Sequence, residues 1–175
     1  MMKHMALVGL SGSGKTTLGG LLAEKLGLPF VDLDREAERR AGMTVKDIFK
    51  RHGEEFFRVL ESDTTREVLE SPAPSVVATG GGVVLRSGNV EVLRENALVV
   101  FLNRPVEHIM NDVPCDGSRP LLTKAGRLQE MERERRPLYL DAADATLLND
   151  AGIVEAMEKL LNLASTRWEL LNHLL

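Results

Sequence analysis

A glycine-rich stretch near the start of the chain limits its possible folds more than any other feature. Residues 9–17 read GLSGSGKTT and lie between the apolar run MALV and the run LGGLLAEKLG. Glycines at this spacing let backbone N–H groups converge on one anion, and a helix starting at about Lys15 adds the positive end of its dipole. Lys15 would then reach the β- and γ-phosphates, and the Thr16 hydroxyl would ligand Mg²⁺.

The stretch therefore predicts a phosphate-binding loop for a nucleoside triphosphate. The alternative is a glycine- and serine-rich turn between a strand and a helix that binds nothing. The predicted nucleotide contacts of the loop are Gly12, Ser13, Gly14, Lys15, Thr16 and Thr17.

Short apolar runs alternate with longer amphipathic runs along the rest of the chain. Strands are predicted at residues 5–10, 29–34, 75–80, 97–102 and 145–149. Helices are predicted at residues 17–26, 35–41, 44–50, 54–70, 89–95, 105–109, 125–140 and 153–164, and the tail after about residue 165 can form one more. Almost continuously apolar strands separated by helices are typical of a parallel sheet covered on both faces. The sequence predicts one α/β domain over residues 1–175.

The composition argues against several classes of protein. The formal net charge is −4 with both signs mixed along the chain, and aromatic residues make up 4%, which disfavours a nucleic-acid-binding surface. The longest apolar runs are far shorter than a membrane span. The single cysteine, Cys115, has no second thiol to pair with, which favours a reducing compartment. We expect a cytoplasmic protein with a small-molecule substrate and with neither nucleic-acid nor membrane partners.

Two aspartates follow the second predicted strand. Strand alternation would put Asp32 and Asp34 on one side of the chain, at the edge of the sheet where α/β proteins bind ligands. One carboxylate can hold Mg²⁺ through its water shell, and the other can accept a proton from an attacking hydroxyl or orient it. The alternative is that Asp34 only caps the helix beginning at Arg35, which would leave Asp32 unexplained.

A second charged group lies in GEEFFRVLE at residues 53–61. Arg58 and Glu61 are three apart on a predicted helix, so they share a face and can pair. The pair is either a surface ion pair beside two core aromatics, Phe56 and Phe57, or a functional fork. In the second case Arg58 would bind a substrate carboxylate, Glu61 would align it, and a ring beside it would pack on the substrate.

Three glycines and two arginine–proline motifs complete the candidate site. Residues 80–82 are glycines that end a predicted strand in ATGGG, which suggests that the backbone closely approaches a ligand, although a sharp bend alone is the alternative. Arg119 lies in the loop-like stretch NDVPCDGSRPLL, which could close over a site and stabilise a transferring phosphoryl group. ERRPLY lies in a charged predicted helix, and Arg133 and Arg135 are expected on the solvent-exposed face of that helix.

Taken in chain order, these motifs resemble those of the shikimate kinases. The resemblance covers roughly residues 5–160 and rests on GLSGSGKTT, DLD, GEEFFRVLE, ATGGG, RPLL and RRPLY followed by DAAD. It implies a P-loop kinase fold similar to the nucleoside monophosphate kinases, with a five-stranded parallel sheet between two helical layers and a lid at about residues 110–124. It implies that the γ-phosphate of ATP passes to the 3-hydroxyl of shikimate, with Mg²⁺ as cofactor, and that the protein is a monomer.

The resemblance also implies a role for individual residues. Lys15, Asp34 and Arg119 would be catalytic, with Asp34 as the candidate base and Arg119 as a lid residue that contacts the nucleotide. Thr16 would ligand the metal with support from Asp32. The implied substrate contacts are Asp34, Arg58, the backbone of Gly80, Gly81 and Gly82, and Arg136, with Arg58 and Arg136 on the shikimate carboxylate.

One segment departs from the family pattern. Ahead of RPLL the family carries a basic segment whose arginine packs on adenine, whereas residues 108–118 here read HIMNDVPCDGS, with Asn111, Asp112 and Asp116. Acidic residues there would repel nucleotide phosphate and offer no guanidinium to the base, so either weak ATP binding or a different nucleotide is expected, with the acceptor site unchanged. Two other functions stay open: a kinase of the same fold with another acceptor, such as gluconate or a nucleotide, and a kinase-like binding protein without turnover.

Overall fold

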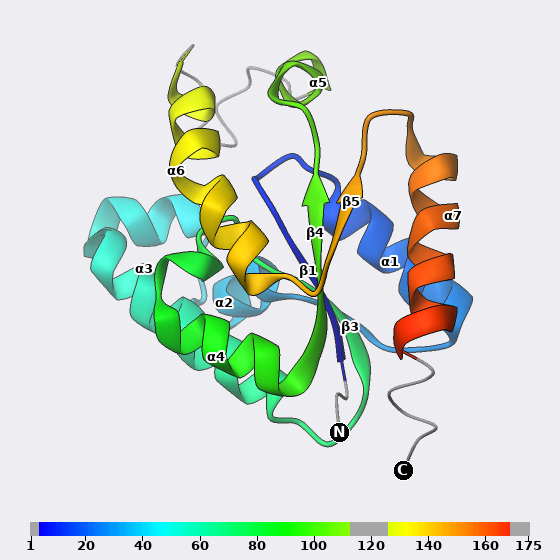
Figure 1. Ribbon diagram of the computed structural model, residues 1–175. Helices are drawn as coiled ribbons and strands as arrows, with labels where there is room; N and C mark the ends of the chain where they lie inside the picture. The colour runs from blue at the N-terminus through cyan, green and yellow to red at the C-terminus, as the bar shows by residue number, and fades with distance from the viewer. Residues whose placement is uncertain (1–3, 113–125, 169–175) are drawn as a thin grey trace.

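Five parallel strands form one sheet in the computed structural model, which describes residues 4–112 and 126–168 (Figure 1). The strands are β1 (His4–Val8), β2 (Phe30–Asp32), β3 (Ser75–Ala78), β4 (Ala97–Asn103) and β5 (Ala145–Leu148). Their order across the sheet is β2-β3-β1-β4-β5, and each neighbouring pair is parallel. The predicted α/β class, the five strands and their parallel arrangement are confirmed.

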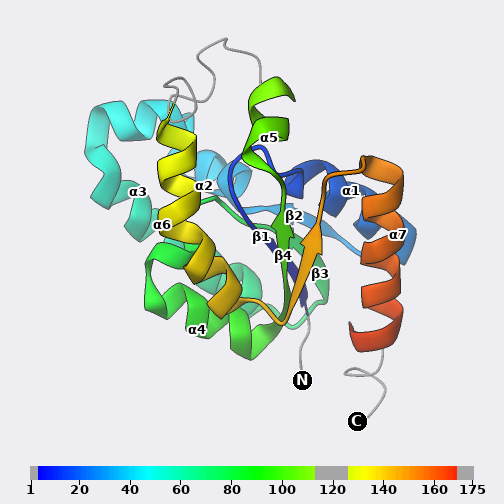
Figure 2. The same cartoon turned by 45° about the horizontal axis from the view of Figure 1, so that its top comes forward.

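Helices connect the strands and cover both faces of the sheet (Figure 2). The helices are α1 (Lys15–Leu26), α2 (Leu33–Ala41), α3 (Val45–Leu69), α4 (Ser87–Asn96), α5 (Val106–Asp112), α6 (Arg127–Ala142) and α7 (Ile153–Leu163). A 3₁₀ turn, η1 (Val83–Leu85), follows β3, and a single π-helical turn, η3 (Ala164–Trp168), ends the described chain. This turn extends α7, where the sequence suggested an extra helix.

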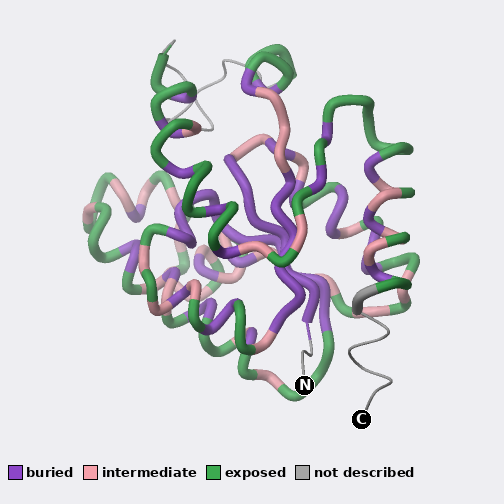
Figure 3. The backbone as a smooth tube through the Cα atoms, viewed as in Figure 1, coloured by how far each residue is buried: buried purple, intermediate pink, exposed green. Residues whose placement is uncertain are grey.

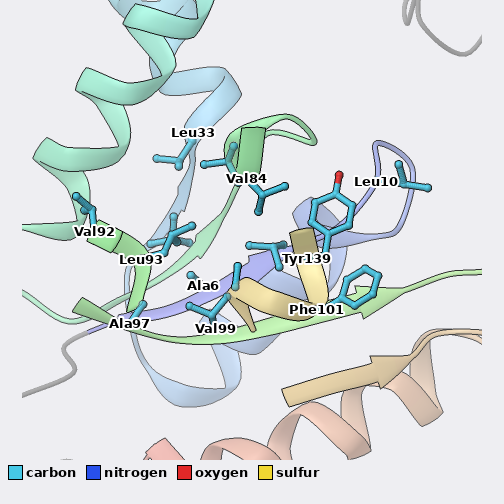
Figure 4. Packing of buried hydrophobic residues seen from close by; sticks show 14 of the residues in the cluster. Ala6, Leu10, Leu33, Val84, Val92, Leu93, Ala97, Val99, Phe101 and Tyr139 are labelled. Atoms are coloured by element: carbon cyan, nitrogen blue, oxygen red, sulfur yellow. The ribbon is translucent and has the colours of Figure 1, made fainter. Parts of the chain in front are cut away.

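Strand alternation divides the core into two layers, one on each side of the buried sheet (Figure 3). Met5 and Leu7 of β1 pack with the apolar residues of α1 and α7. Ala6 and Val8 point the other way and join Val92 and Leu93 of α4 and the apolar face of α6 (Figure 4). Since successive strand side chains point to opposite faces, a strand that is apolar at every position requires both helical layers.

Local signals in the sequence explain where several helices begin and end. Gly27 and Gly42 adopt left-handed conformations, with φ of 66° and 65°, and end α1 and α2. The Thr44 side chain accepts a hydrogen bond from the Asp47 N–H and so caps the start of α3. The helices predicted at residues 44–50 and 54–70 follow each other in α3, and Gly53 separates them by a kink, with a non-helical φ of 83° and ψ of 174°.

Among the described residues, 4–112 and 126–168, none of the helices is both long and apolar enough to cross a membrane. The carboxyl ends of the strands meet at one edge of the sheet, at the top of Figure 1. The polar residues that follow the strands are therefore brought together at this edge.

Candidate active site

The glycine-rich loop leads from β1 directly into α1. Gly9, Gly12 and Gly14 have φ of 146°, 85° and 98°, which residues with a side chain rarely adopt. The helix then begins at Lys15, as the sequence predicts. The Lys15 ammonium folds back over the loop and donates to the carbonyls of Gly9 and Leu10, both at 2.8 Å. The loop thus presents N–H groups, a helix start and one buried cation around a single point, which suits a phosphate.

Asp32 joins the loop to the second strand. Its Oδ2 accepts a hydrogen bond of 2.7 Å from the Thr16 hydroxyl, and its Oδ1 accepts from the N–H groups of Asp34 and Arg35 at 3.1 and 3.3 Å. Asp32, and not Asp34, is therefore the cap of the following helix. The strand ends at Asp32, so Asp34 lies in the first turn of α2 and strand alternation does not orient it; that part of the sequence interpretation was wrong.

Thr16 and Asp32 offer oxygen atoms, the donors that Mg²⁺ prefers. The described part of the chain contains no group of three or more histidine, cysteine or acidic side chains that could hold a metal alone. Two protein oxygens suit Mg²⁺, which usually keeps several waters and takes its remaining ligands from substrate phosphates. The residues therefore fit a metal that arrives with the nucleotide.

Charged side chains pack directly against the backbone of Gly80 and Gly82, and Ser11 packs against Gly81, where a Cβ atom would lie 3.0 Å from its Oγ. A Cβ atom at Gly80 would lie 2.6 Å from both Asp34 Oδ1 and Glu61 Oε1. A Cβ atom at Gly82 would lie 2.6 Å from the Cζ atom of Arg58. None of the three glycines has positive φ, so close approach, and not backbone conformation, excludes side chains here.

Arg58 and Glu61 form a buried ion pair on α3, as their spacing predicts. Arg58 Nη1 donates to Glu61 Oε2 at 2.7 Å, with side chains only 8% and 3% exposed. Arg58 also donates to Glu54 at 3.1 Å from Nη2. The other Glu61 oxygen, Oε1, is buried without a hydrogen-bond partner beside Gly80. Burial raises the pKa of Glu61 and the charge of Asp34 adds to the rise, while Arg58 and Arg135 oppose it.

The two phenylalanines beside Arg58 have different environments. Phe57 is buried in a small cluster between α2 and α3, and the Arg58 guanidinium lies 5.4 Å from its ring centroid. Phe56 is 48% exposed and packs beside His52, with ring centroids 4.8 Å apart. Only one of the two is therefore a core aromatic.

Arg135 reaches the same glycines from α6, on the other side of the site. It is buried and donates from Nη1 to the Gly81 carbonyl at 3.1 Å, and Tyr139 donates to the same oxygen. Burial raises the pKa of Tyr139 to about 12, so its hydroxyl stays protonated. The interpretation of Arg135 as part of a solvated face was wrong. Helical spacing could have corrected it, because Arg135 shares the buried face of α6 with Leu128, Met131 and Tyr139.

Arg136 lies one position further round α6. Its side chain is 48% exposed, and its Nε atom lies 3.3 Å from Glu132 Oε1 one turn earlier. It lines a small cavity together with Leu10 of the loop and Arg104. The structure therefore places Arg58 and Arg135 against the glycine segment, residues 80–82. Arg136 lies at the half-exposed rim of the site.

The predicted lid falls largely on residues that the structure does not describe. Arg119 and Asp116 lie outside the described residues. Asp112, the last residue of α5, is exposed and forms an ion pair with Arg104, which follows β4. The negative charge that was expected to repel nucleotide is thus balanced at Asp112 by an arginine of the same chain.

The sequence interpretation gave no role to two residues that touch these loops. Tyr139 was part of a quoted motif, but its contact with Gly81 was not foreseen. Asn149, the last residue of the fifth predicted strand, directly follows the observed β5 and donates from its side chain to the Ser13 carbonyl at 2.9 Å. The signal was present, since the same reasoning from a polar residue at the end of a strand had already assigned Asp32 to the site.

Comparisons with known proteins agree on one family. A family model described as "Shikimate kinase" matches residues 11–164. A shikimate kinase from Paracidovorax citrulli is 44% identical over 170 residues, which cover 92% of this chain and 93% of the relative. A shikimate kinase from Symbiobacterium thermophilum is 43% identical over 167 residues, with 90% and 95% covered.

Solved structures give the same result. The shikimate kinase from Acinetobacter baumannii in complex with shikimate superposes with a TM-score of 0.88 at 36% identity, covering 95% of this chain and 96% of that one. The Mycobacterium tuberculosis APS kinase CysC superposes with a TM-score of 0.60 at 16% identity, covering 94% and 98%, and so shares the fold.

Proposed function

This chain belongs to the shikimate kinase family, and from that premise we propose how its residues transfer the γ-phosphate of ATP to the 3-hydroxyl of shikimate. The protein is an ATP-dependent kinase, and its acceptor carries a carboxylate at one end and hydroxyl groups at the other. The site must therefore supply cations for the carboxylate, a carboxylate for the hydroxyls and a cradle for the triphosphate.

We propose that Arg58 and Arg135 bind the shikimate carboxylate. Both guanidinium groups are buried and both lie against residues 80–82, approaching from α3 and α6. Glu61 holds Arg58 in place, and because a guanidinium presents five donors in a fork, Arg58 keeps N–H groups for a ligand. Arg136, which the family resemblance singled out, is paired with Glu132 and more exposed, which supports a contact at the rim.

Asp34 is proposed to act on the attacking hydroxyl. Its Oδ1 lies beside Gly80, on the same glycine segment that the arginines approach. The 3-hydroxyl of shikimate would give its proton to Asp34 while its oxygen forms a bond to the γ-phosphorus. The bond between that phosphorus and the bridging oxygen breaks, and ADP leaves with both bonding electrons.

The phosphates of ATP would lie in the loop at residues 9–17. Lys15 would exchange its two carbonyl partners for phosphate oxygens, and Gly12, Ser13, Gly14 and Thr17 would contribute N–H or hydroxyl groups. Thr16 and Asp32 would hold Mg²⁺, which neutralises charge on the phosphates. Arg119, outside the described residues, is proposed as the cation that stabilises the transferring phosphoryl group. Every described residue proposed for the site comes from one chain, which supports a monomer, and the lone cysteine supports a cytoplasmic location.

The single observation that carries this assignment is the convergence of Asp34, Arg58 and Arg135 on three consecutive glycines. The test is shikimate-dependent release of ADP from ATP and Mg²⁺, compared between the wild type and Asp34→Asn. Loss of the proton acceptor should lower kcat about 100-fold or more while the fold is kept. Asp63→Asn, an exposed aspartate on α3, serves as the control and should keep full activity. Equal turnover of Asp34→Asn and wild type would remove Asp34 from the chemical step.

A further inference from the structure

A buried asparagine at the end of β5 contacts the phosphate-binding loop. Asn149 is 7% exposed, and its backbone N–H donates to the Asn103 carbonyl of the neighbouring strand at 2.9 Å. The backbone of Asn149 is therefore held on the sheet. Its Nδ2 atom donates to the Ser13 carbonyl at 2.9 Å, which joins residues 136 positions apart in the chain.

This hydrogen bond determines the direction of one peptide group. The Ser13 carbonyl and the Gly14 N–H belong to the same planar trans peptide, so they point in opposite directions. Asn149 holds the carbonyl toward β5, and the Gly14 N–H must then point away from β5. A glycine on each side of Ser13 gives this peptide unusual freedom to rotate, with φ of 85° at Gly12 and 98° at Gly14.

Packing supports the same role. A Cβ atom at Gly14 would lie 3.1 Å from Asn149 Nδ2, so the amide fills the space beside this glycine. Gly14 also precedes the first residue of α1 and has no side-chain cap for the helix start. Asn149, which lies outside the loop, therefore restrains the Ser13–Gly14 part of the loop through its side chain.

We propose that Asn149 is a positioning residue for the nucleotide, which holds the Ser13–Gly14 peptide so that the Gly14 N–H can donate to phosphate. The inference rests on the loop being the ATP site, as proposed above. Asn149 does not touch the phosphate; it removes the freedom of a peptide that would otherwise have to be ordered when ATP binds. Loss of the Asn149 side chain should therefore weaken nucleotide binding and leave shikimate binding unchanged.

The test compares Asn149→Ala and Asn149→Leu with the wild type. Asn149→Leu keeps the approximate size of the side chain and removes the donor without adding a charge beside the phosphates, so it fills the same space if the alanine variant folds poorly. Asn96→Ala is the matched control, since Asn96 Nδ2 also donates to a backbone carbonyl at 2.9 Å, within α4 and away from the loop. Kd values for ADP with Mg²⁺ and for shikimate are measured by calorimetry, alongside kcat and both KM values.

Both Asn149 variants should raise the Kd for ADP and the KM for ATP about tenfold, the usual scale for loss of a buried hydrogen bond. The Kd for shikimate should stay within about twofold, and Asn96→Ala should change none of these values. Unchanged nucleotide affinity in folded Asn149 variants would overturn the inference and leave Asn149 with a role in stability only. A wild type that binds shikimate but not ADP would instead overturn the assignment of the loop, and this inference with it.

Discussion

At the scale of single residues, two adjacent arginines in ERRPLY have different surroundings. Successive residues of a helix point about 100° apart, so Arg135 faces Gly81 with Tyr139 while Arg136 faces Glu132 at the rim. We predict that Arg135→Ala raises the KM for shikimate about ten- to hundredfold, the scale of a lost charge-assisted hydrogen bond. Arg136→Ala should raise it less than about threefold. Steady-state kinetics with shikimate as the varied substrate would show the opposite order if Arg136 were the main carboxylate ligand.

At the scale of elements, the kink in α3 separates the helix into two parts. Gly53 has φ 83° and ψ 174°, a backbone conformation available almost only to glycine, and a Cβ atom there would meet nothing within 4 Å. A substitution would therefore act through backbone strain alone. The kink sets the direction of the segment before it relative to Arg58 and Glu61, which lie in the part after it.

We predict that Gly53→Ala lowers the free energy of unfolding by about 1–3 kcal/mol, measured by urea denaturation. Gly27→Ala is the control: its φ of 66° is in the ordinary left-handed region, where alanine costs less, and its Cβ would also meet nothing within 4 Å. If both substitutions cost the same, the unusual ψ at Gly53 would carry no strain of its own.

At the scale of the whole molecule, the core consists of two large clusters on the sheet and one small cluster apart from it. The small cluster has Ala37, Ile48 and Phe57 as its buried residues and lies between α2 and α3. Few buried apolar contacts mean a low free energy of local opening. The elements that carry Asp34 and Arg58 are therefore the parts that we expect to open most easily.

Hydrogen exchange measured by mass spectrometry tests this difference. Amides of β1 and β4, which lie between both large clusters, should exchange most slowly, and amides of residues 45–52 should exchange much faster. Saturating shikimate should slow the exchange of residues 45–52 in particular, because a ligand that binds only the closed form stabilises it. Equally slow exchange in residues 45–52 and β4 would contradict the prediction.

The sequence alone determined the class of fold and two parts of the candidate site. The phosphate-binding loop, the five strands and the pairing of Arg58 with Glu61 follow from local patterns: glycine spacing, apolar runs and the three-residue interval on a helix. Each of these signals lies within a few residues of the chain, so no tertiary information is needed to interpret it.

Only the tertiary structure decided which side chains meet across the site. The hydrogen bonds from Arg135 and Tyr139 to Gly81 and from Asn149 to Ser13 join residues 54, 58 and 136 positions apart. The structure also paired Asp112 with Arg104, eight residues away, and so balanced a charge that looked unfavourable in the sequence. Such contacts depend on how helices and strands pack around the sheet, and packing is a property of the folded chain that no local pattern encodes.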